Sequence, residues 1–233
     1  MSPLPEVDSQ TTLQHGAGAL GLELDHPTTS ALLRYLALLQ KWNRVHNLTA
    51  VRDPAAMLTH HLLDSLAVVL PLRRWLVERS VDWRAPLRVL DVGSGAGLPG
   101  IVLALLHPNW HVDCVDAVGK KAAFVQQAAV ELGLTQVRGL HARVETLTRP
   151  DQGYDVITAR AFAALEALVD LTAPLLRPGG FWLAMKGRDP QGEMMALPPQ
   201  MRVFHVEPLQ VPGLDAARCV LALEPVRADS GGG

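Results

Sequence analysis

Hydrophobic residues in the first third of the chain recur at the spacing of a helix. Residues 28–46 place them one, three and four positions apart, which predicts one buried helical face, made of Leu32, Leu33, Tyr35, Leu36, Leu39, Trp42 and Val45. Asp53 as a cap and Pro54 in the first turn predict a second helix, which Pro71 ends or kinks. We therefore expect residues 1–25 to form a flexible arm or a short helix, and residues 26–85 a helical extension.

The pattern changes at residue 86, where short apolar runs begin to alternate with helical segments. This alternation predicts a doubly wound α/β domain over residues 86–226. The expected strands are 87–91, 110–116, 137–140, 154–158, 181–186, 203–209 and 219–223. The expected helices are 98–106, 119–132 and 164–176, with a turn at 178–180. No helical pattern separates the last two strands, so we expect them to pair antiparallel. Residues 227–233 are expected to form a disordered tail.

Composition and charge narrow the class of protein. Hydrophobic residues make up 48% of the 233, enough for a full core, and the net charge of −2 is not that of a general nucleic-acid binder. Residues 28–75, however, hold six basic and only two acidic residues, a local excess of +4. No signal peptide and no apolar stretch approaching a membrane span is evident. Cys114 and Cys219 are expected to be buried in a reducing, cytoplasmic protein.

A glycine-rich turn follows the first expected strand and fits two cofactor patterns. Gly95, Gly97 and Gly100 match the dinucleotide pattern GxGxxG. The same turn, read as Asp91, Gly93, Gly95 and Gly97, matches the S-adenosylmethionine pattern of an acid followed by alternating glycines. Either match alone is weak, since such a turn can be purely structural.

Three features favour S-adenosylmethionine over a dinucleotide. Asp91 would repel a pyrophosphate, but its carboxylate suits the cationic amino-acid part of S-adenosylmethionine. Asp116 ends the second expected strand and can accept both ribose hydroxyls, which supports a nucleoside ligand but does not distinguish S-adenosylmethionine from a dinucleotide. The antiparallel pair at the end of the chain replaces the second mononucleotide half of a dinucleotide fold. After the third expected strand, Val144 or Glu145 could bind adenine, although a plain surface turn is an equal reading.

The fourth expected strand ends at the place where a methyl acceptor would lie. Arg160 can hydrogen-bond the O6/N7 edge of guanine or a phosphate, and Phe162 can stack on a base. An internal salt bridge and core packing are their alternative roles. Neither an amine-binding Asn/Asp-Pro-Pro-aromatic motif nor a cysteine placed as a nucleophile is present. Lys186 could line the substrate mouth, and Lys120 and Lys121 are expected on the solvated surface. No metal-ligand pattern is evident.

Several motifs occur together in a fixed order. They are residues 47–53 (NLTAVRD), His61 with Asp64 and Ser65, residues 91–101 (DVGSGAGLPGI), residues 160–163 (RAFA) and residues 186–187 (KG). In this order they resemble the bacterial 16S ribosomal RNA guanine-N7 methyltransferases, also called glucose-inhibited division protein B. The resemblance covers about residues 28–225 and is most specific in Leu98-Pro99-Gly100-Ile101 and the RAFA segment.

The resemblance implies a seven-stranded, Rossmann-like class I methyltransferase sheet with S-adenosylmethionine as methyl donor. It implies a guanine of the decoding region of 16S rRNA as acceptor. Naked rRNA and the 30S subunit both remain open as the form of the substrate, and we expect a monomer. The cofactor contacts that the resemblance implies are Gly93, Leu98, Val144, Glu145 and Arg160. With the basic extension and the pocket mouth, we expect substrate contacts from Lys41, Arg44, Asn47, Arg52, His61 and Lys186. An NAD-dependent oxidoreductase and a non-catalytic RNA-binding assembly factor remain alternatives.

Overall fold

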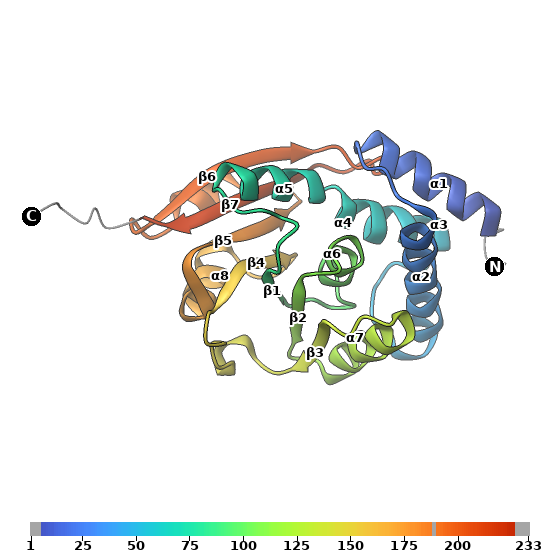
Figure 1. Ribbon diagram of the computed structural model, residues 1–233, viewed down its shortest axis with the longest axis horizontal. Coiled ribbons are helices and arrows are strands. Elements are labelled where there is room, and N and C mark those ends of the chain that lie inside the picture. The colour runs from blue at the N-terminus through green and yellow to red at the C-terminus, as the bar shows by residue number, and fades with distance from the viewer. Residues whose placement is uncertain (1–5, 188–189, 227–233) are drawn as a thin grey trace, which may run out of the picture.

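A seven-stranded sheet forms the centre of the molecule (Figure 1). The computed structural model describes residues 6–187 and 190–226. The strands lie in the order β3-β2-β1-β4-β5-β7-β6. β1 to β5 are parallel, and β7 is antiparallel to both β5 and β6. The antiparallel pairing of β6 with β7 confirms the prediction for the last two strands. The strand bounds are β1 Arg88–Val92, β2 His111–Asp116, β3 Val137–His141, β4 Tyr154–Arg160, β5 Leu176–Lys186, β6 Met201–Leu209 and β7 Arg218–Pro225.

β5 is longer than expected, because the predicted turn at 178–180 lies inside it. The pairing of β4 with β5 shifts register between Tyr154 and Val156, and Gly179 has φ +81°. The Pro-Gly-Gly run therefore makes an irregularity at the start of a strand rather than a separate turn.

The N-terminal segment, expected as a flexible arm or a short helix, contains a packed helix. α1 spans Glu6–Ala19, and its Leu13 and Ala17 are fully buried. A Cβ on Gly16 would come within 2.7 Å of the terminal methyl groups of Leu63, so the helix and this side chain are in close contact. Residues 6–19 are thus part of the fold, whereas residues 1–5 and the predicted tail at 227–233 lie outside the described residues.

α2 spans His26–His46 and confirms the predicted amphipathic helix. Asp25 caps it by accepting a hydrogen bond from the amide of Thr28, and Asn47 ends it with φ +48°. Its buried residues are Thr29, Leu32, Tyr35, Leu36, Leu39 and Asn43. Val45, predicted on the same face, is instead 72% exposed.

A run of short helices follows: α3 Pro54–Met57, the π-helix η1 Leu58–Leu63, α4 Asp64–Leu66 and α5 Val69–Glu78. Asp53 caps α3 as predicted, accepting from the amide of Ala56 at 2.8 Å. The predicted break at Pro71 lies earlier, at residues 67–68. Pro71 sits in the first turn of α5, where its missing N–H costs little.

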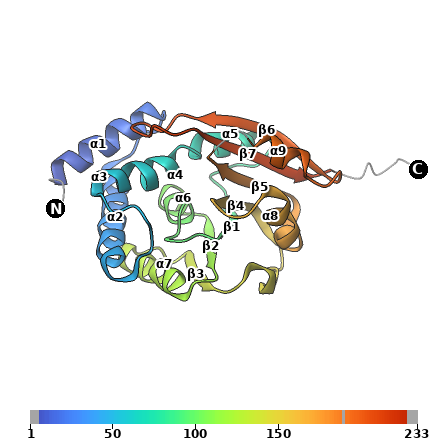
Figure 2. The same ribbon diagram turned by 180° about the vertical axis from the view of Figure 1, so that it is seen from behind.

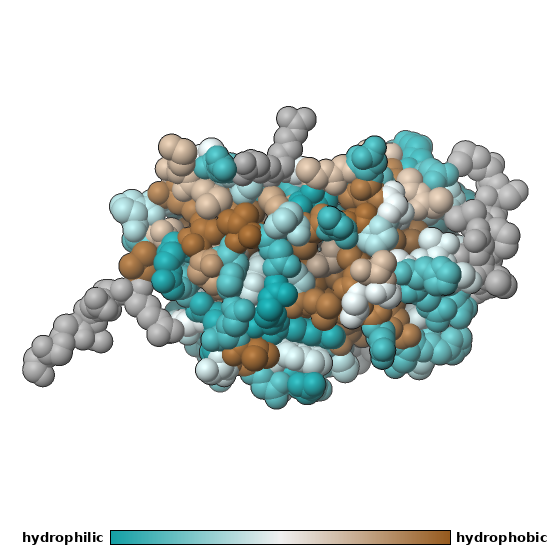
Figure 3. All heavy atoms as spheres, turned by 90° about the horizontal axis from the view of Figure 1, so that it is seen from above, coloured by the Kyte–Doolittle hydropathy of each residue, from teal (hydrophilic) through white to brown (hydrophobic). Residues whose placement is uncertain are grey.

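This run changes one expectation about membranes. By length and composition Pro54–Glu78 passes as a membrane span, contrary to the expected absence of such a stretch. However, 72% of its most apolar window is buried inside the fold, as in a core helix. Figure 3 shows the face of the molecule that lies at the top in Figure 1, where apolar residues form small groups between polar ones.

Helices cover both faces of the sheet (Figures 1 and 2). The remaining elements are α6 Gly100–Leu106, α7 Gly119–Leu132, the 3-10 helices η2 Val144–Thr146 and η3 Ala173–Leu175, α8 Leu165–Thr172 and α9 Gln191–Met195. One buried cluster joins α1, α2 and the α3–α5 run to α6, α7 and one face of the sheet. A second packs α8 on the other face. The extension and the sheet domain therefore share a single core.

Candidate functional site

The glycine-rich turn lies between β1 and α6 and has the backbone shape that its sequence predicts. Gly93, Gly95 and Gly97 have φ values of +61°, +58° and +83°, a region that L side chains avoid. A Cβ on Gly93 would come within 2.6 Å of the ring of Phe162. The turn thus presents bare backbone at the carboxyl end of β1, and open α/β sheets bind ligands at the carboxyl ends of their strands.

Asp91, expected to bind the cationic part of S-adenosylmethionine, lines neither of the two cavities described below. The residue is fully buried, and its Oδ2 accepts a hydrogen bond of 2.8 Å from the amide of Gly100. Its Oδ1 has no hydrogen-bond partner among the described residues. Burial raises the pKa of Asp91 to about 7. In this arrangement the carboxyl group holds the start of α6 and keeps one oxygen for a further donor.

Asp116 ends β2 beside the turn, as predicted. Its Oδ2 accepts from the amide of Gly95 at 3.0 Å, and its Oδ1 accepts from the amide of Val118 at 2.8 Å. Lys121 Nζ lies 3.7 Å from Oδ2. Each carboxylate oxygen can accept more than one hydrogen bond, so ribose hydroxyls can still bind to this group.

Two neighbouring cavities meet at the turn. The smaller, of about 230 Å³ and here called the nucleoside hollow, lies at the ends of β2 and β3 and has apolar walls from Val92, Val115, Val144 and Leu171. Asp116 and Glu145 also line it. The larger, of about 560 Å³ and here called the acceptor pocket, lies between β4, β5 and the α3–α5 run. Gly93 and Phe162 line both cavities.

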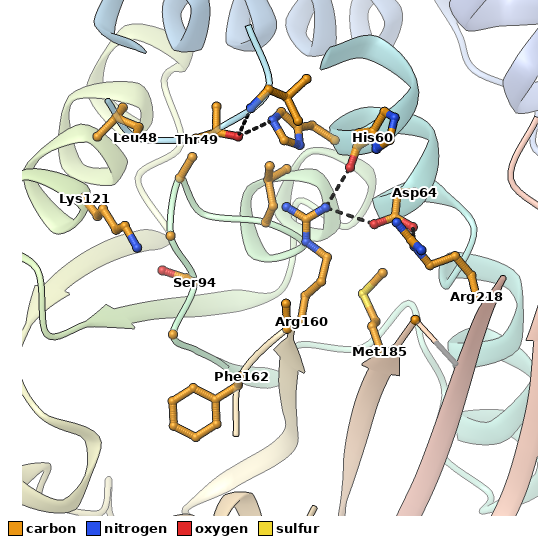
Figure 4. A pocket seen from close by; sticks show the side chains of 18 of the residues that line it. Leu48, Thr49, His60, Asp64, Ser94, Lys121, Arg160, Phe162, Met185 and Arg218 are labelled. Atoms are coloured by element: carbon orange, nitrogen blue, oxygen red, sulfur yellow. Dashed lines mark hydrogen bonds and ion pairs between the residues drawn. The ribbon is translucent and has the colours of Figure 1, made fainter. Parts of the chain in front are cut away.

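Arg160 occupies the centre of the acceptor pocket (Figure 4). Its Nη1 donates to the carbonyl oxygen of His60 at 2.8 Å and to Asp64 Oδ2 at 2.9 Å. The π-helix η1 carries His60, and such helices often occur at functional sites. Arg160 therefore makes the internal salt bridge considered as its alternative role and lines the pocket as well.

The residues after Arg160 turn sharply. Ala161 has φ +51°, an uncommon conformation for a residue with a side chain. Phe162 then returns over Gly93 and is half-buried. The strained residue separates the two side chains, so that Arg160 enters the acceptor pocket while Phe162 lies at the boundary of the two cavities.

His61 is buried in the pocket wall. Its Nε2 lies 3.1 Å from the hydroxyl of Thr49, which belongs to the loop between α2 and α3. Burial lowers the pKa of His61 to about 4, so the ring is neutral at pH 7. Asn43 fixes the same loop, because its side chain accepts from the amide of Thr49 and donates to the carbonyl of Val51. The histidine thus ties the loop to the pocket.

Lys186 ends β5 and lines the pocket mouth, as predicted. Its Nζ donates to Glu193 Oε2 at 2.7 Å and to the carbonyl of Ala163 at 2.9 Å. The ammonium group is therefore already paired, and it holds the segment after β4 against α9.

The remaining predicted substrate residues lie outside both cavities and are exposed. Arg44 and Arg52 line a small hollow beside α3. Lys41 and Arg34, both on α2, line another hollow between α2 and α7. Arg52 donates to the side chain of Asn47 at 2.9 Å. Gly97 likewise lines neither cavity, whereas Gly95 and Leu98 line the acceptor pocket.

Sequence reasoning missed several pocket residues. Lys121, assigned to the solvated surface, lines the acceptor pocket together with Ser94, Met185 and Arg218. A signal for Arg218 exists in hindsight: β7 is antiparallel to β5, so its first residue lies at the edge where the parallel strands end. His61 and Asp64 belong to a motif that the sequence analysis named. The contacts of Asp64 with Arg160 and Arg218, however, have no signal in the sequence.

Comparison with known proteins decides the family. Residues 28–221 match the family described as "GidB: rRNA small subunit methyltransferase G". The chain belongs to this rRNA small subunit methyltransferase G family. A relative of that name from Acidovorax sp. (strain JS42) is 56% identical over 97% of this chain and 100% of its own. Another, from Leptothrix cholodnii, is 58% identical over 92% and 94%.

Solved structures agree on the fold. TrmN from Thermus thermophilus is 27% identical with a TM-score of 0.53, over 69% of this chain and 48% of its own. The [4+2]-cyclase SpnF is 16% identical with a TM-score of 0.54, over 86% and 96%. A SAM-dependent methyltransferase from Aquifex aeolicus is 18% identical with a TM-score of 0.50, over 65% and 88%. The two neighbours below 25% identity support only the architecture, which is the Rossmann-like methyltransferase fold expected for this family.

The residues present fit S-adenosylmethionine. The bare backbone at Gly93 leaves room that a Cβ would fill, and the nucleoside hollow offers apolar walls with a carboxylate beside them. Buried polar atoms without a hydrogen-bond partner among the described residues cluster near the turn: Asp91 Oδ1, Ser94 Oγ and Thr158 Oγ1. Of these residues, Ser94 lines the acceptor pocket, whereas Asp91 and Thr158 line neither cavity.

Proposed function

We propose that this protein transfers the methyl group of S-adenosylmethionine to N7 of a guanine in the decoding region of 16S ribosomal RNA. The observation that carries the proposal is the junction of the two cavities at Gly93 and Phe162, because a donor and an acceptor bound there would meet. Membership of the rRNA small subunit methyltransferase G family supplies the substrate class.

The donor's nucleoside is assigned to the hollow. Val144 and Val115 would face adenine, and Asp116 would accept the ribose hydroxyls. The backbone of Gly93 and Gly95 would lie along the methionine part. S-adenosylmethionine supplies, when bound, an electrophilic methyl group on a sulfonium sulfur.

The acceptor chemistry asks little of the protein. Guanine N7 has an in-plane lone pair, so no general base has to remove a proton before transfer, and no nucleophilic cysteine is needed. Both cysteines are buried, in keeping with this view. The side chains of the pocket would act by alignment, holding N7 at near-attack distance. Because the methylated ring is cationic, Arg160 would act on a phosphate, on O6 or on the donor rather than at N7.

The RNA itself would be held by the basic extension. Lys41, Arg44 and Arg52 are exposed on α2 and on the following loop, on the side of the molecule that also contributes Thr49 to the pocket. Contacts of this kind position the RNA backbone and make affinity depend on salt. We further propose that the protein acts as a cytoplasmic monomer without a metal ion, on naked rRNA or on the 30S subunit.

The experiment is a tritiated methyl-transfer assay on 30S subunits and on protein-free 16S rRNA, followed by chemical cleavage at N7-methylguanine to locate the product. We expect one labelled guanine and loss of transfer in Arg160→Ala. Persistent transfer at the wild-type rate in a folded Arg160→Ala variant would remove that residue from the mechanism. RNA binding without any methyl transfer would favour the assembly-factor alternative, and calorimetric binding of NAD instead of S-adenosylmethionine would favour the oxidoreductase.

A further inference from the structure

Asp64 binds two arginines that come from distant parts of the chain. Its Oδ2 accepts from Arg160 at 2.9 Å, and its Oδ1 accepts from Arg218 Nε at 3.0 Å (Figure 4). The Asp64 side chain is only 3% exposed, whereas those of Arg160 and Arg218 are 21% and 23% exposed. One buried carboxylate thus holds two guanidinium groups at the wall of the acceptor pocket.

The formal charges in this cluster do not cancel. Two cations share one carboxylate, which leaves an excess positive charge in a partly dehydrated site. The two lysines that line the pocket are each paired with a carboxylate, Lys186 with Glu193 and Lys121 with Asp116. Asp91 also interacts with Arg160, but burial raises its pKa to about 7, so it offsets only part of this charge. Within the described part of the chain, the excess charge of the pocket therefore lies at Arg160 and Arg218, where an anion would be stabilised.

Both arginines also keep donors for a ligand. A guanidinium group has five N–H donors. Arg218 donates through Nε to Asp64 and through Nη1 to the carbonyl of Ala217, while Arg160 donates through Nη1 alone. The remaining donors and the planar fork suit an oxyanion such as a phosphate.

The position of Arg218 points to the acceptor rather than the donor. In Figure 4, Arg218 and Ser94 of the glycine turn lie on opposite sides of Arg160. Arg218 lines the acceptor pocket but not the nucleoside hollow. A ligand bound to Arg218 would therefore approach from the side away from the methyl donor.

We propose that Arg218, oriented by Asp64 beside Arg160, binds a backbone phosphate of the target RNA strand at the acceptor pocket. The proposal rests on the proposed function and adds to it a contact made at the reaction site, separate from the exposed cations of the extension.

The molecule contains a matched cluster that serves as an internal control. Glu224, at the other end of β7, is likewise buried and binds two arginines, Arg79 and Arg202. Arg79 lies over the rings of Phe181 and Phe204. Neither Arg202 nor Glu224 lines the acceptor pocket or the nucleoside hollow. Arg202→Gln therefore also removes one arginine from a buried carboxylate, at a more exposed position (64% against 23% for Arg218) and without touching the site.

The experiment compares Arg218→Gln, Arg218→Lys and Arg202→Gln in the full-length protein. S-adenosylmethionine affinity is measured by calorimetry without RNA, and single-turnover methyl transfer is measured against 16S rRNA concentration at several salt concentrations. Thermal unfolding checks that each variant folds. For Arg218→Gln we expect the half-saturating RNA concentration to rise about tenfold, as for the loss of one hydrogen bond to a charged group.

We also expect the slope of log affinity against log salt to become shallower by about 0.7, the contribution of one phosphate of a single strand. Arg218→Lys should restore the slope but only part of the affinity, since lysine keeps the charge without the fork. Arg202→Gln should leave all three quantities unchanged.

The outcomes separate this inference from the function on which it rests. The phosphate contact of Arg218 would be refuted if a folded Arg218→Gln variant kept the RNA affinity and salt slope of the wild type. The proposed function would then still stand, provided that the wild-type protein transfers the methyl group. Weaker S-adenosylmethionine binding with unchanged RNA dependence would also refute the phosphate contact and would assign the oxyanion to the donor's carboxylate. Failure of the wild-type protein to methylate the RNA would instead refute the proposed function.

Discussion

The hydroxyl of Tyr35 donates a hydrogen bond of 2.7 Å to the carbonyl oxygen of Ala96. Tyr35 lies on α2 and is fully buried, while Ala96 belongs to the glycine turn and lines the acceptor pocket. A helix of the N-terminal extension thus holds the loop that is proposed to bind the methyl donor. The side chain that makes this contact is one of only two tyrosines in the chain.

Replacing Tyr35 by Phe should weaken S-adenosylmethionine binding several-fold. The ring keeps its packing, but the Ala96 carbonyl loses its donor, at a cost of about 1 kcal/mol in the free energy of unfolding. Tyr154→Phe is the matched control, because that hydroxyl donates to Asp113 at 2.8 Å at the opposite end of β4. It should lower stability similarly and leave the calorimetric affinity unchanged. Equal losses of affinity in both variants would show that Tyr35 has no specific effect on the turn.

The buried carboxyl group of Asp91 should make stability depend on pH. Its folded-state pKa of about 7 exceeds the ordinary value of 3.8, so the folded protein binds this proton more tightly than the unfolded chain. The stabilisation from this proton is complete below about pH 4 and is lost as the pH rises through 7. Asp91→Asn should gain on the wild type across that window, by at most about 4 kcal/mol.

The measurement is chemical denaturation of both proteins at pH 5 and pH 8. His61 and His107, whose pKa values burial lowers to about 4, are present in both proteins and cancel in the comparison. A difference between the variants that stays constant from pH 5 to pH 8 would contradict the raised pKa.

Adding a methyl group at Gly93 should disrupt the donor site. The new Cβ would meet the Phe162 ring at 2.6 Å, and alanine is strained at φ +61°. We expect Gly93→Ala to lose S-adenosylmethionine binding in calorimetry by at least tenfold. The double variant with Phe162→Ala should recover the steric part of that loss but not the backbone strain. No recovery would mean that the ring is not what confines the turn.

Removing Lys41, Arg44 and Arg52 together should weaken RNA binding without changing donor binding. All three are exposed, and the salt slope should become shallower for every cation that no longer neutralises a phosphate. Filter binding to 16S rRNA at several salt concentrations measures this, with calorimetry for S-adenosylmethionine. The control replaces three exposed cations outside the extension, Arg138, Arg149 and Arg202, and removes the same charge. Equal effects of the two triple variants would indicate a general charge effect rather than a specific RNA-binding surface.

Local patterns predicted the elements that build the site. The alternation of apolar runs predicted the parallel strands, and the absence of a helical pattern between residues 209 and 219 predicted the antiparallel pairing of β6 and β7. The glycine spacing gave the turn, and the position of Arg160 at a strand end gave its place in the pocket. These features depend on residues close together in the sequence, where periodicity and backbone preferences act.

Features that depend on distant contacts were not predictable. α1 has little amphipathic pattern, and its place in the core follows from the contact of Gly16 with Leu63. Asp91 was expected to face the ligand, but it is fully buried. The sequence alone does not show which carboxylate the turn will cover. The salt bridge of Arg160 with Asp64 joins residues 96 positions apart. No local rule assigns such a pair.

The common core of the extension and the sheet has a consequence for how the protein can be divided. A fragment starting at residue 86 would remove the helices that cover Phe124 and Val125 and would take away Tyr35, Thr49 and Asp64 together. The boundary expected near residue 85 therefore marks a change in sequence pattern, and we do not expect the two sides to fold as separate fragments. RNA recognition and methyl transfer would have to be inherited as one unit, since neither half keeps a complete binding site without the other.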